Sequence, residues 1–485
     1  MSLKRRTFSA GRWTTASALM RSCFQILQVM ILARLLLPAD FGLMAVAASL
    51  LAVLSLFTDI GLSRAIIHFE NISKDALASL FWLNLLMGAS LSVLFAITAP
   101  LLADIFNLVG LKTVLLAVSP IFVLSAAGQQ FRTLAEKEFR FASLAINEIG
   151  ASVLGFIAAV AIALCGGGVY ALVGAALVTS GINSVLAWLR LSSGYRPHWH
   201  LRFAETKRFL RFGGYLVGEG ILSTITRQAD VFVGGLNLSP TALGTYSVPR
   251  DLSLRVSMVV NPIITRVGFP VMSRLQDDIS ALKSVYLQTL RMTASVNFPV
   301  YLALGLFADE IVALLYGPHW KGARLYLRIL AVWGLVRSTG NPVGSLLHAV
   351  GAVRRAFWWN FAVAITLIFF YWVATSGWGL TGLATSLVIT QVGLLVPVWY
   401  FLVRPYCGAT LGEYFRQLGT PLMISLIAGV IAWLATRNVP HGTLRLALGS
   451  LIGGTIYLGL SWILNRRWFD AMWTLLHLPT RTSTQ

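Results

Sequence analysis

The stretch ARLLLPADFGLM, residues 33–44, joins two long and mostly apolar runs and decides how this chain folds. The first run reaches Pro38, a short interruption follows, and the apolar sequence resumes at Gly42. Proline cannot continue a helix, and glycine tolerates the backbone of a tight turn. The pattern therefore predicts a helical hairpin in which Pro38 ends one helix, Asp40 stays in water and Gly42 starts the next.

The composition is that of a membrane protein. Of 485 residues, 57% are hydrophobic and 12% are charged, with a mean hydropathy of +0.75, whereas about a quarter of an ordinary soluble chain is charged. The net charge of +20 would suggest nucleic acid in a soluble protein. Here no basic domain with exposed aromatics accompanies it, so we expect membrane lipids and no nucleic acid as partners.

Fourteen apolar segments have lengths that suit membrane-crossing helices. The segments that this topology places in the cytoplasm hold 26 Lys and Arg, and the outer loops hold five, Arg445 among them. This asymmetry predicts that both termini are cytoplasmic. The predicted spans are 13–36, 42–66, 77–98, 112–132, 144–165, 168–190, 210–236, 242–265, 286–307, 325–349, 357–375, 378–403, 419–436 and 443–465.

The hairpin motif recurs 202 residues later. PADFGLMAV at 38–46 aligns with PTALGTYSV at 240–248, and the same offset pairs Asp59 with Asn261. LLADIF at 101–106 similarly resembles LFADEI at 306–311. Each repeat has six helices, an even number, so both repeats have the same orientation in the membrane and the repeat is parallel. Bundles of this kind often bind substrate between two lobes and work by alternating access.

The predicted fold is an all-α polytopic membrane protein of about 14 transmembrane helices. It has two six-helix lobes and two additional C-terminal helices. The predicted boundaries are 1–190 for the first lobe, 191–209 for a basic cytoplasmic linker, 210–403 for the second lobe, and 404–485 for the last helices and a cytoplasmic tail.

Charged and amide side chains within the predicted spans are the candidate functional residues, because intramembrane charges usually face a cavity or a partner. Arginine suits an anionic substrate because its fork binds phosphate oxygens in pairs and stays charged. A structural ion pair between Arg227 and Asp230 is the alternative. The candidate substrate-binding residues are Arg21, Gln25, Gln28, Arg227, Arg250, Arg255 and Arg337. The candidate ion-coupling residues are Asp59, Glu219, Asp230 and Asp251.

The sequence carries none of the common enzyme or metal-site motifs considered below. No Walker A, HExxH or GxSxG sequence is present, and no kinase motifs accompany the Asp40–Gly42 triplet. The three cysteines form no CxxC pair, and His198 with His200 lacks further ligands, so we expect neither a catalytic residue nor a metal site.

Residues 32–67, LARLLLPADFGLMAVAASLLAVLSLFTDIGLSRAII, resemble the opening of bacterial oligosaccharide flippases. EKEFRFASLAINEIG at 136–150 and GGGVYALVGAALV at 166–178 resemble later segments of the same family. The resemblance covers residues 10–405. It is strongest to the Wzx-type polysaccharide transporters of the multidrug/oligosaccharidyl-lipid/polysaccharide exporter superfamily.

This resemblance implies a non-enzymatic flippase in the bacterial inner membrane. It would move undecaprenyl-diphosphate-linked sugar repeat units by alternating access, for exopolysaccharide, capsule or O-antigen synthesis. It further implies no cofactor, a proton or sodium gradient as the driving force, and a polymerase and a chain-length regulator as partners. A multidrug or other lipid-linked precursor exporter of the same superfamily, and a membrane glycosyltransferase or ligase, stay open as alternatives.

Overall fold

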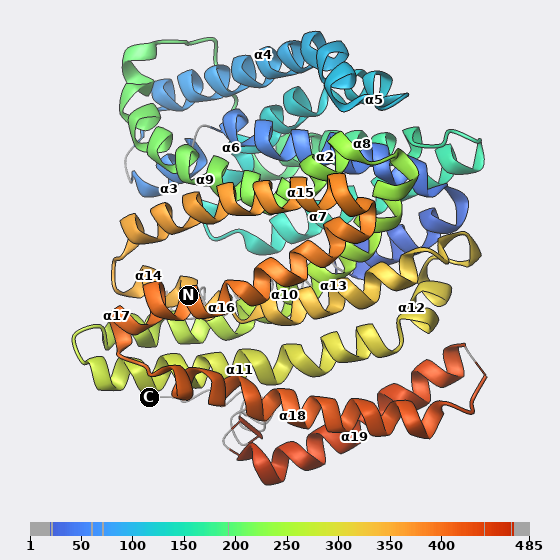
Figure 1. The fold of residues 1–485 in the computed structure, drawn as a ribbon. Helices are drawn as coiled ribbons and strands as arrows, with labels where there is room; N and C mark the ends of the chain where they lie inside the picture. Colours follow the sequence, from blue (N-terminus) through green and yellow to red (C-terminus); the bar gives the residue numbers. More distant parts are fainter. Residues whose placement is uncertain are drawn as a thin grey trace. The chain divides into compact units, whose positions relative to one another are not determined.

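The computed structural model describes residues 20, 23–59, 62–69, 72–192, 194–440, 442–466 and 468–469. Every regular element in these residues is a helix (Figure 1). The chain divides into two compact units. Unit 1 comprises Met1–Ser247 and Asn360–Leu383, and unit 2 comprises Val248–Trp359 and Ala384–Gln485. This division differs from the predicted lobe boundaries, which stay a prediction.

Unit 1 holds the N-terminal helices. They are the apolar helix Cys23–Leu35, α2 (Pro38–Asp59), α3 (Leu62–His68), α4 (Lys74–Phe106), α5 (Leu111–Val118), α6 (Ile121–Lys137), α7 (Phe141–Leu164), α8 (Tyr170–Leu186), the π-helical turn η1 (Ala187–Leu191) and α9 (Phe203–Asn237). The long helix α10 (Pro240–Arg274) begins in unit 1 and continues into unit 2.

Unit 2 holds most of the later helices. They are α11 (Ile279–Leu306), α12 (Ala308–Leu315), the 3-10 turn η2 (Pro318–Trp320), α13 (Ala323–Ser338), α14 (Asn341–Ala349), α15 (Val353–Gly393), α16 (Leu395–Val398), the π-helical turn η3 (Trp399–Val403), α17 (Arg404–Cys407), α18 (Leu411–Thr436) and α19 (Thr443–Leu464). The middle of α15 belongs to unit 1.

Length and composition allow many of these helices to cross a membrane. Eight helices in the described part of the chain meet both requirements, or nine if α11 and α12, which meet at a 79° bend, form one span. The prediction of an all-helical, multi-pass membrane protein is confirmed. The count of fourteen spans and the two six-helix lobes stay predictions.

The opening hairpin is tighter than expected. The first helix ends at Leu35, and α2 begins at Pro38 rather than at Gly42. The fixed φ of proline suits the first turn of a helix, and the backbone N–H of Leu37 donates to Asp40 Oδ2 at 3.0 Å. The predicted helix start at Gly42 is therefore wrong, because Asp40 already lies in the first turn of α2 and caps the helix there.

The two copies of the hairpin motif meet each other in unit 1. A Cβ atom added to Gly42 would collide with the backbone carbonyl of Pro240, and one added to Gly244 would collide with that of Pro38. The same Cβ positions lie 2.9 Å from Gly244 N and 3.0 Å from Gly42 N, respectively. This reciprocal contact places α2 against the start of α10, and it explains why both copies of the motif need glycine.

Several predicted spans are broken in the structure. Residues 112–132 form α5 and α6, separated at Ser119 and Pro120, and residues 325–349 form α13 and α14. The two spans predicted within 357–403 meet at Gly379, whose φ of 58° and ψ of −141° interrupt α15. Because an L-residue with a side chain is strained in that conformation, glycine sets the position of this break.

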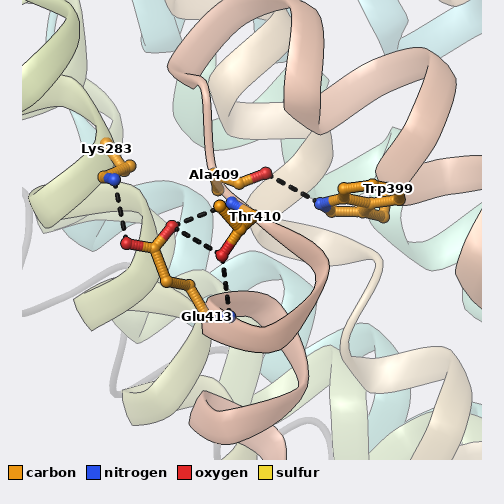
Figure 2. Close-up of polar contacts among 5 residues, drawn as sticks. All are labelled: Lys283, Trp399, Ala409, Thr410 and Glu413. Carbon is orange, nitrogen blue, oxygen red and sulfur yellow. Dashed lines mark hydrogen bonds and ion pairs between the residues drawn. The ribbon is translucent and has the colours of Figure 1, made fainter.

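The start of α18 is fixed to α11 by a small polar network in unit 2 (Figure 2). Thr410 and Glu413 form a capping box, and Lys283 Nζ of α11 pairs with Glu413 Oε1 at 2.9 Å. Trp399 Nε1 donates to the Ala409 carbonyl at 2.9 Å. The cap satisfies orphan backbone donors of α18 and stabilises it by about 1 kcal/mol, so the network sets where this helix begins.

The segment predicted as a basic linker lies against α4 in unit 1. Trp82 Nε1 donates to the His198 carbonyl at 2.9 Å, and His198 Nε2 lies 3.1 Å from Asp75 Oδ1. Burial, with a smaller contribution from the Asp75 charge, raises the pKa of Tyr195 in this segment to about 12. Residues 195–198 are therefore held in place by the helical bundle.

Candidate functional site

The predicted polar residues of unit 1 that the structure describes lie on two helices. Gln25 is exposed and Gln28 is half-buried on the helix Cys23–Leu35, while Arg227 is exposed and Asp230 is buried on α9. Arg21 lies outside the described residues, as do the side chains of Asp59 and Glu219. The structure therefore describes four of the predicted residues in this unit.

Arg227 is oriented by its own helix. Its Nη1 donates to Ser223 Oγ and its Nη2 to Thr224 Oγ1, both at 2.8 Å. These partners lie four and three residues earlier, on the neighbouring turn of α9. The two hydroxyls position a guanidinium whose five N–H donors lie in one plane.

Asp230 is buried, with 4% of its surface exposed. Its Oδ2 accepts a hydrogen bond of 2.5 Å from the hydroxyl of Tyr246, which lies in the first part of α10 and is itself fully buried. A charge-assisted hydrogen bond of this kind lowers the cost of burying a carboxylate. The sequence indicated Asp230 but gave no sign of its tyrosine partner.

The predicted residues of unit 2 begin with Arg250, Asp251 and Arg255 on α10. Arg250 is buried, and its Nη1 lies 3.3 Å from Oδ1 of the exposed Asp251. Arg255 is half-buried, one helical turn further along α10. This helix therefore carries two arginines inside or at the edge of an apolar bundle, where charges require a functional or structural partner.

Arg337 lines a polar cavity in unit 2. The cavity has a volume of about 470 Å³, and α10, α13, the start of α14 and the end of α15 form it. The half-buried guanidinium of Arg337 lies over the Trp333 ring, 5.1 Å from its centroid. The lining residues are Leu254, Ser257, Met258, Asn261, Arg337, Gly340, Asn341 and Gln391.

Sequence reasoning missed Arg132 as a candidate residue. On α6, Arg132 Nη2 donates to Gln129 Oε1 at 2.6 Å, and Gln129 Nε2 donates to Ser63 Oγ of α3 at 3.0 Å. Arg132 follows the start of LLADIF at the same distance as Arg337 follows the start of LFADEI. The internal repeat could therefore have identified it as the counterpart of Arg337.

Sequence reasoning also misplaced Arg445. Its charge was counted with the outer loops although the predicted span 443–465 includes it, and it lies in the first turn of α19, where its Nη1 is 3.0 Å from Glu310 Oε1 of α12. The side chains of Arg445 and Glu310 are only 7% and 2% exposed. A buried pair between two helices explains why this arginine can leave water.

The described residues contain no group of three or more His, Cys, Asp and Glu side chains that could hold a metal ion. The rings of His198 and His200 lie 5.7 Å apart, and His198 contacts Asp75.

Together, the apolar helices and the polar side chains within both units define a multi-pass helical membrane protein with a partly cationic interior. The family model of polysaccharide biosynthesis proteins matches residues 31–325, and the chain belongs to this family.

Named relatives and a solved structure agree with this membership. Lipopolysaccharide biosynthesis protein WzxC of Escherichia coli (strain K12) is 29% identical over 435 residues, which cover 89% of this chain and 88% of WzxC. Teichuronic acid biosynthesis protein TuaB of Bacillus subtilis (strain 168) is 26% identical over 94% of this chain and 95% of TuaB. The inward closed structure of the lipid II flippase MurJ has a TM-score of 0.73 at 14% identity, over 95% of this chain and 99% of MurJ, which shows the same fold.

Proposed function

We propose that this protein is a flippase for lipid-linked oligosaccharides. It moves undecaprenyl-diphosphate-linked repeat units from the inner to the outer face of the bacterial inner membrane by alternating access. The exported units serve the synthesis of exopolysaccharide, capsule or O-antigen. The protein acts as a transporter and not as an enzyme.

The observation that carries this proposal is the set of arginines inside an apolar helical bundle. Arg250 is buried, Arg255 is half-buried, and Arg337 lines a polar cavity in unit 2. Intramembrane arginines are expensive and mark substrate pathways, and their guanidinium groups bind diphosphate and carboxylate oxygens in pairs. The polysaccharide family and the MurJ-like fold support the same substrate class.

A multidrug exporter of the same superfamily is the runner-up. Cationic drugs would favour a cavity lined by carboxylates and aromatic rings. Among the described residues that line the polar cavity, Arg337 is the only charged one. This lining favours an anionic substrate.

The proposal also covers the membrane topology, the driving force and the partner proteins. We place fourteen spans in two six-helix lobes with two additional helices, and both termini in the cytoplasm. The reciprocal packing of Gly42 and Gly244 supports a parallel repeat. A proton or sodium gradient drives transport without a cofactor, with Asp230 as the coupling residue. A polysaccharide polymerase and a chain-length regulator act next to the protein.

The proposal is tested by complementing a strain that lacks the gene. Arg227→Ala and Arg255→Ala should abolish polymer export and cause lipid-linked repeat units to accumulate, while the amount of protein in the membrane stays unchanged. Polymer in the medium and lipid extracts of the cells give the two measurements.

Arg416→Ala is the matched control, because Arg416 is exposed near the start of α18, a helix that carries none of the candidate site residues. This variant should export normally. Normal export by both Arg227→Ala and Arg255→Ala would contradict the assignment of these arginines to the substrate path.

A further inference from the structure

One end of unit 2 carries exposed positive charge. This end holds the start of α15, the turn η3, α17 and the start of α18. Residues 351–416 include four arginines and one acid, Glu413, and Glu413 is already paired with Lys283 at 2.9 Å. The four arginines are all exposed, and they are Arg354, Arg355, Arg404 and Arg416. The acid of this segment therefore does not neutralise its arginines.

A π-helical turn places Arg404 over two aromatic rings. The backbone N–H of Arg404 donates to the carbonyl of Trp399, five residues earlier, which is the hydrogen bond that defines a π-helix. The guanidinium carbon of Arg404 lies 5.8 Å from the ring centroids of both Trp399 and Tyr400. Single π-helical turns are rare and are frequent at functional sites. Here the turn positions one arginine.

Arg355 stacks on an aromatic ring of a different helix. Its guanidinium carbon lies 5.6 Å from the ring centroid of Tyr406 in α17. The ring of Trp359, one turn further along α15, contacts the ring of Phe401 in η3 at a centroid distance of 6.0 Å. These contacts join the start of α15 to η3 and α17, so both arginines belong to one cluster of arginine and aromatic side chains.

The rings of this cluster are held in place. Trp399 Nε1 donates to the Ala409 carbonyl at 2.9 Å (Figure 2), and the rings of Trp359, Trp399 and Tyr406 pack against a buried core cluster of unit 2. A fixed ring offers its face to a cation. Stacking covers the face of a guanidinium and leaves the N–H donors in its plane for an oxyanion.

Exposed apolar side chains accompany the two stacked arginines in the chain. They are Phe357, Trp358, Tyr400 and Phe401, which are 37%, 58%, 50% and 49% exposed. Aromatic side chains of this kind are enriched where a membrane protein meets the headgroup level of the bilayer. A soluble anion would use only the arginines, whereas a phospholipid brings a phosphate together with glycerol and acyl chains. The combination therefore favours a lipid.

We propose that Arg355 and Arg404 bind the headgroup phosphate of an anionic bilayer phospholipid, such as phosphatidylglycerol, as a resident lipid of the protein. Guanidinium groups bind phosphate oxygens in pairs, and the exposed rings contact the glycerol and the upper acyl chains. The proposed topology places both arginines in cytoplasmic segments, where basic clusters beside transmembrane helices recognise anionic headgroups. This lipid is not transported, so the inference goes beyond the proposed function.

The test is equilibrium binding of lipids to the purified full-length protein in detergent. The probes are phosphatidylglycerol and phosphatidylcholine with identical acyl chains. Wild-type protein should bind phosphatidylglycerol about tenfold or more tightly, since charge-assisted hydrogen bonds contribute on that scale. The double variant Arg355→Gln/Arg404→Gln should lose this preference and keep its binding of phosphatidylcholine. A wild type without the preference, or a double variant that retains it, would overturn the inference.

Arg416→Gln is the matched control, because Arg416 is exposed at the same end of unit 2 but lies outside the stacked cluster. This variant removes the same charge and should keep the preference for phosphatidylglycerol. An equal loss of preference in Arg416→Gln would mean that diffuse positive charge attracts the lipid, which contradicts a site at Arg355 and Arg404.

Competition separates a bilayer phospholipid from other sources of phosphate. Inorganic phosphate and farnesyl diphosphate, a short polyprenyl diphosphate, are each added at the concentration of the bound phosphatidylglycerol. Neither should displace the phospholipid from the wild type. Displacement by inorganic phosphate would identify a site for soluble anions, and displacement by farnesyl diphosphate would assign the site to the transported lipid. Either result would overturn the inference.

Discussion

At the scale of single residues, the ion pair between Glu310 and Arg445 is the feature with the clearest energetic consequence. Both side chains are almost fully buried and lie 3.0 Å apart. The attraction within such a pair offsets the desolvation of both charges, so removal of one partner leaves an uncompensated charge in the bundle. The pair therefore holds the short helix α12 against α19.

We expect Glu310→Gln and Arg445→Gln each to destabilise the protein by about 3–5 kcal/mol. The double variant Glu310→Met/Arg445→Met should lie closer to the wild type, because it leaves no buried charge. Thermal unfolding of the detergent-solubilised protein measures this effect. Arg328→Gln provides the control, since Arg328 is exposed and the loss of its pair with Asp309 should change stability by less than about 1 kcal/mol. Equal melting temperatures for all variants would refute the argument.

Asp278 provides a pH-dependent contribution at the start of α11. Its Oδ1 accepts from the backbone N–H groups of Ala281 and Ser280, both at 3.0 Å, and from the Ser280 hydroxyl at 2.8 Å. The Ala281 hydrogen bond, followed by the Ser280 hydroxyl, lowers the pKa of Asp278 below its ordinary value.

Because the folded-state pKa is depressed, this stabilisation is present above the unfolded-state pKa of roughly 4. It is lost as the pH falls through the folded-state pKa. Asp278→Asn should therefore melt with a weaker dependence on acidic pH than the wild type. Melting curves recorded from neutral to acidic pH measure the difference, and parallel curves for the two proteins would contradict the capping role.

The sequence predicts which residue types enter the bundle better than it predicts their partners. Arg337 and Asp230 stand out because charge is rare in apolar segments. The Tyr246 hydroxyl on Asp230 and the Glu310 carboxylate on Arg445 depend on contacts between different helices. Hydropathy along one helix carries no information about such contacts.

At the scale of elements, the crossing of α2 and α10 depends on two glycines. Gly42 and Gly244 each face the backbone of the opposite helix, at a separation that leaves no space for a methyl group. The neighbouring atoms are backbone carbonyls, which cannot move aside as a flexible side chain can. Glycine at the equivalent position of both repeats therefore allows α2 and α10 to pack backbone against backbone.

We expect Gly42→Ala and Gly244→Ala each to destabilise the protein by about 1–3 kcal/mol, because an extra methyl group must separate the helices. Gly419→Ala in α18 is the control, since a Cβ added there meets nothing within 4 Å. This control should be neutral or slightly stabilising. Thermal unfolding of the three variants provides the comparison, and equal stability of all three would refute the reciprocal packing.

Element type and approximate position follow from the sequence, but helix breaks do not. The apolar length of residues 443–465 predicts α19 almost to the residue. The breaks at Ser119–Pro120 and Thr339–Gly340 interrupt segments that a hydropathy profile shows as continuous. Their positions depend on packing within each unit, which local sequence alone does not specify.

At the scale of the whole molecule, both units are apolar helical bundles with polar and charged side chains in their interiors. Transport of a charged glycan through a membrane requires such a combination, because the hydrocarbon excludes diphosphate and sugar alike. Coupling to an ion gradient additionally requires an acid that can bind and release a cation. Asp230, buried and hydrogen-bonded to Tyr246, has this chemistry.

Asp230→Asn should retain binding of the lipid-linked oligosaccharide and lose the acceleration of transport by a proton or sodium gradient. The asparagine keeps the size of the side chain and a hydrogen bond to Tyr246, but it cannot bind a cation as a carboxylate does. Transport rates with and without an imposed gradient measure the effect. An unchanged response to the gradient would make Asp230 a structural residue.

The central claim is tested most directly by transport under an imposed proton or sodium gradient, in vesicles that contain only the purified protein and its substrate. Undecaprenyl-diphosphate-linked repeat units from a strain lacking the protein are incorporated, and a membrane-impermeant oxidant of vicinal diols is added outside. Our account predicts that the wild type exposes the inner-leaflet glycans to the oxidant, whereas Arg255→Ala vesicles react only in the outer leaflet. The account is contradicted if vesicles with wild-type protein, like vesicles without protein, show oxidation of the outer-leaflet glycans alone.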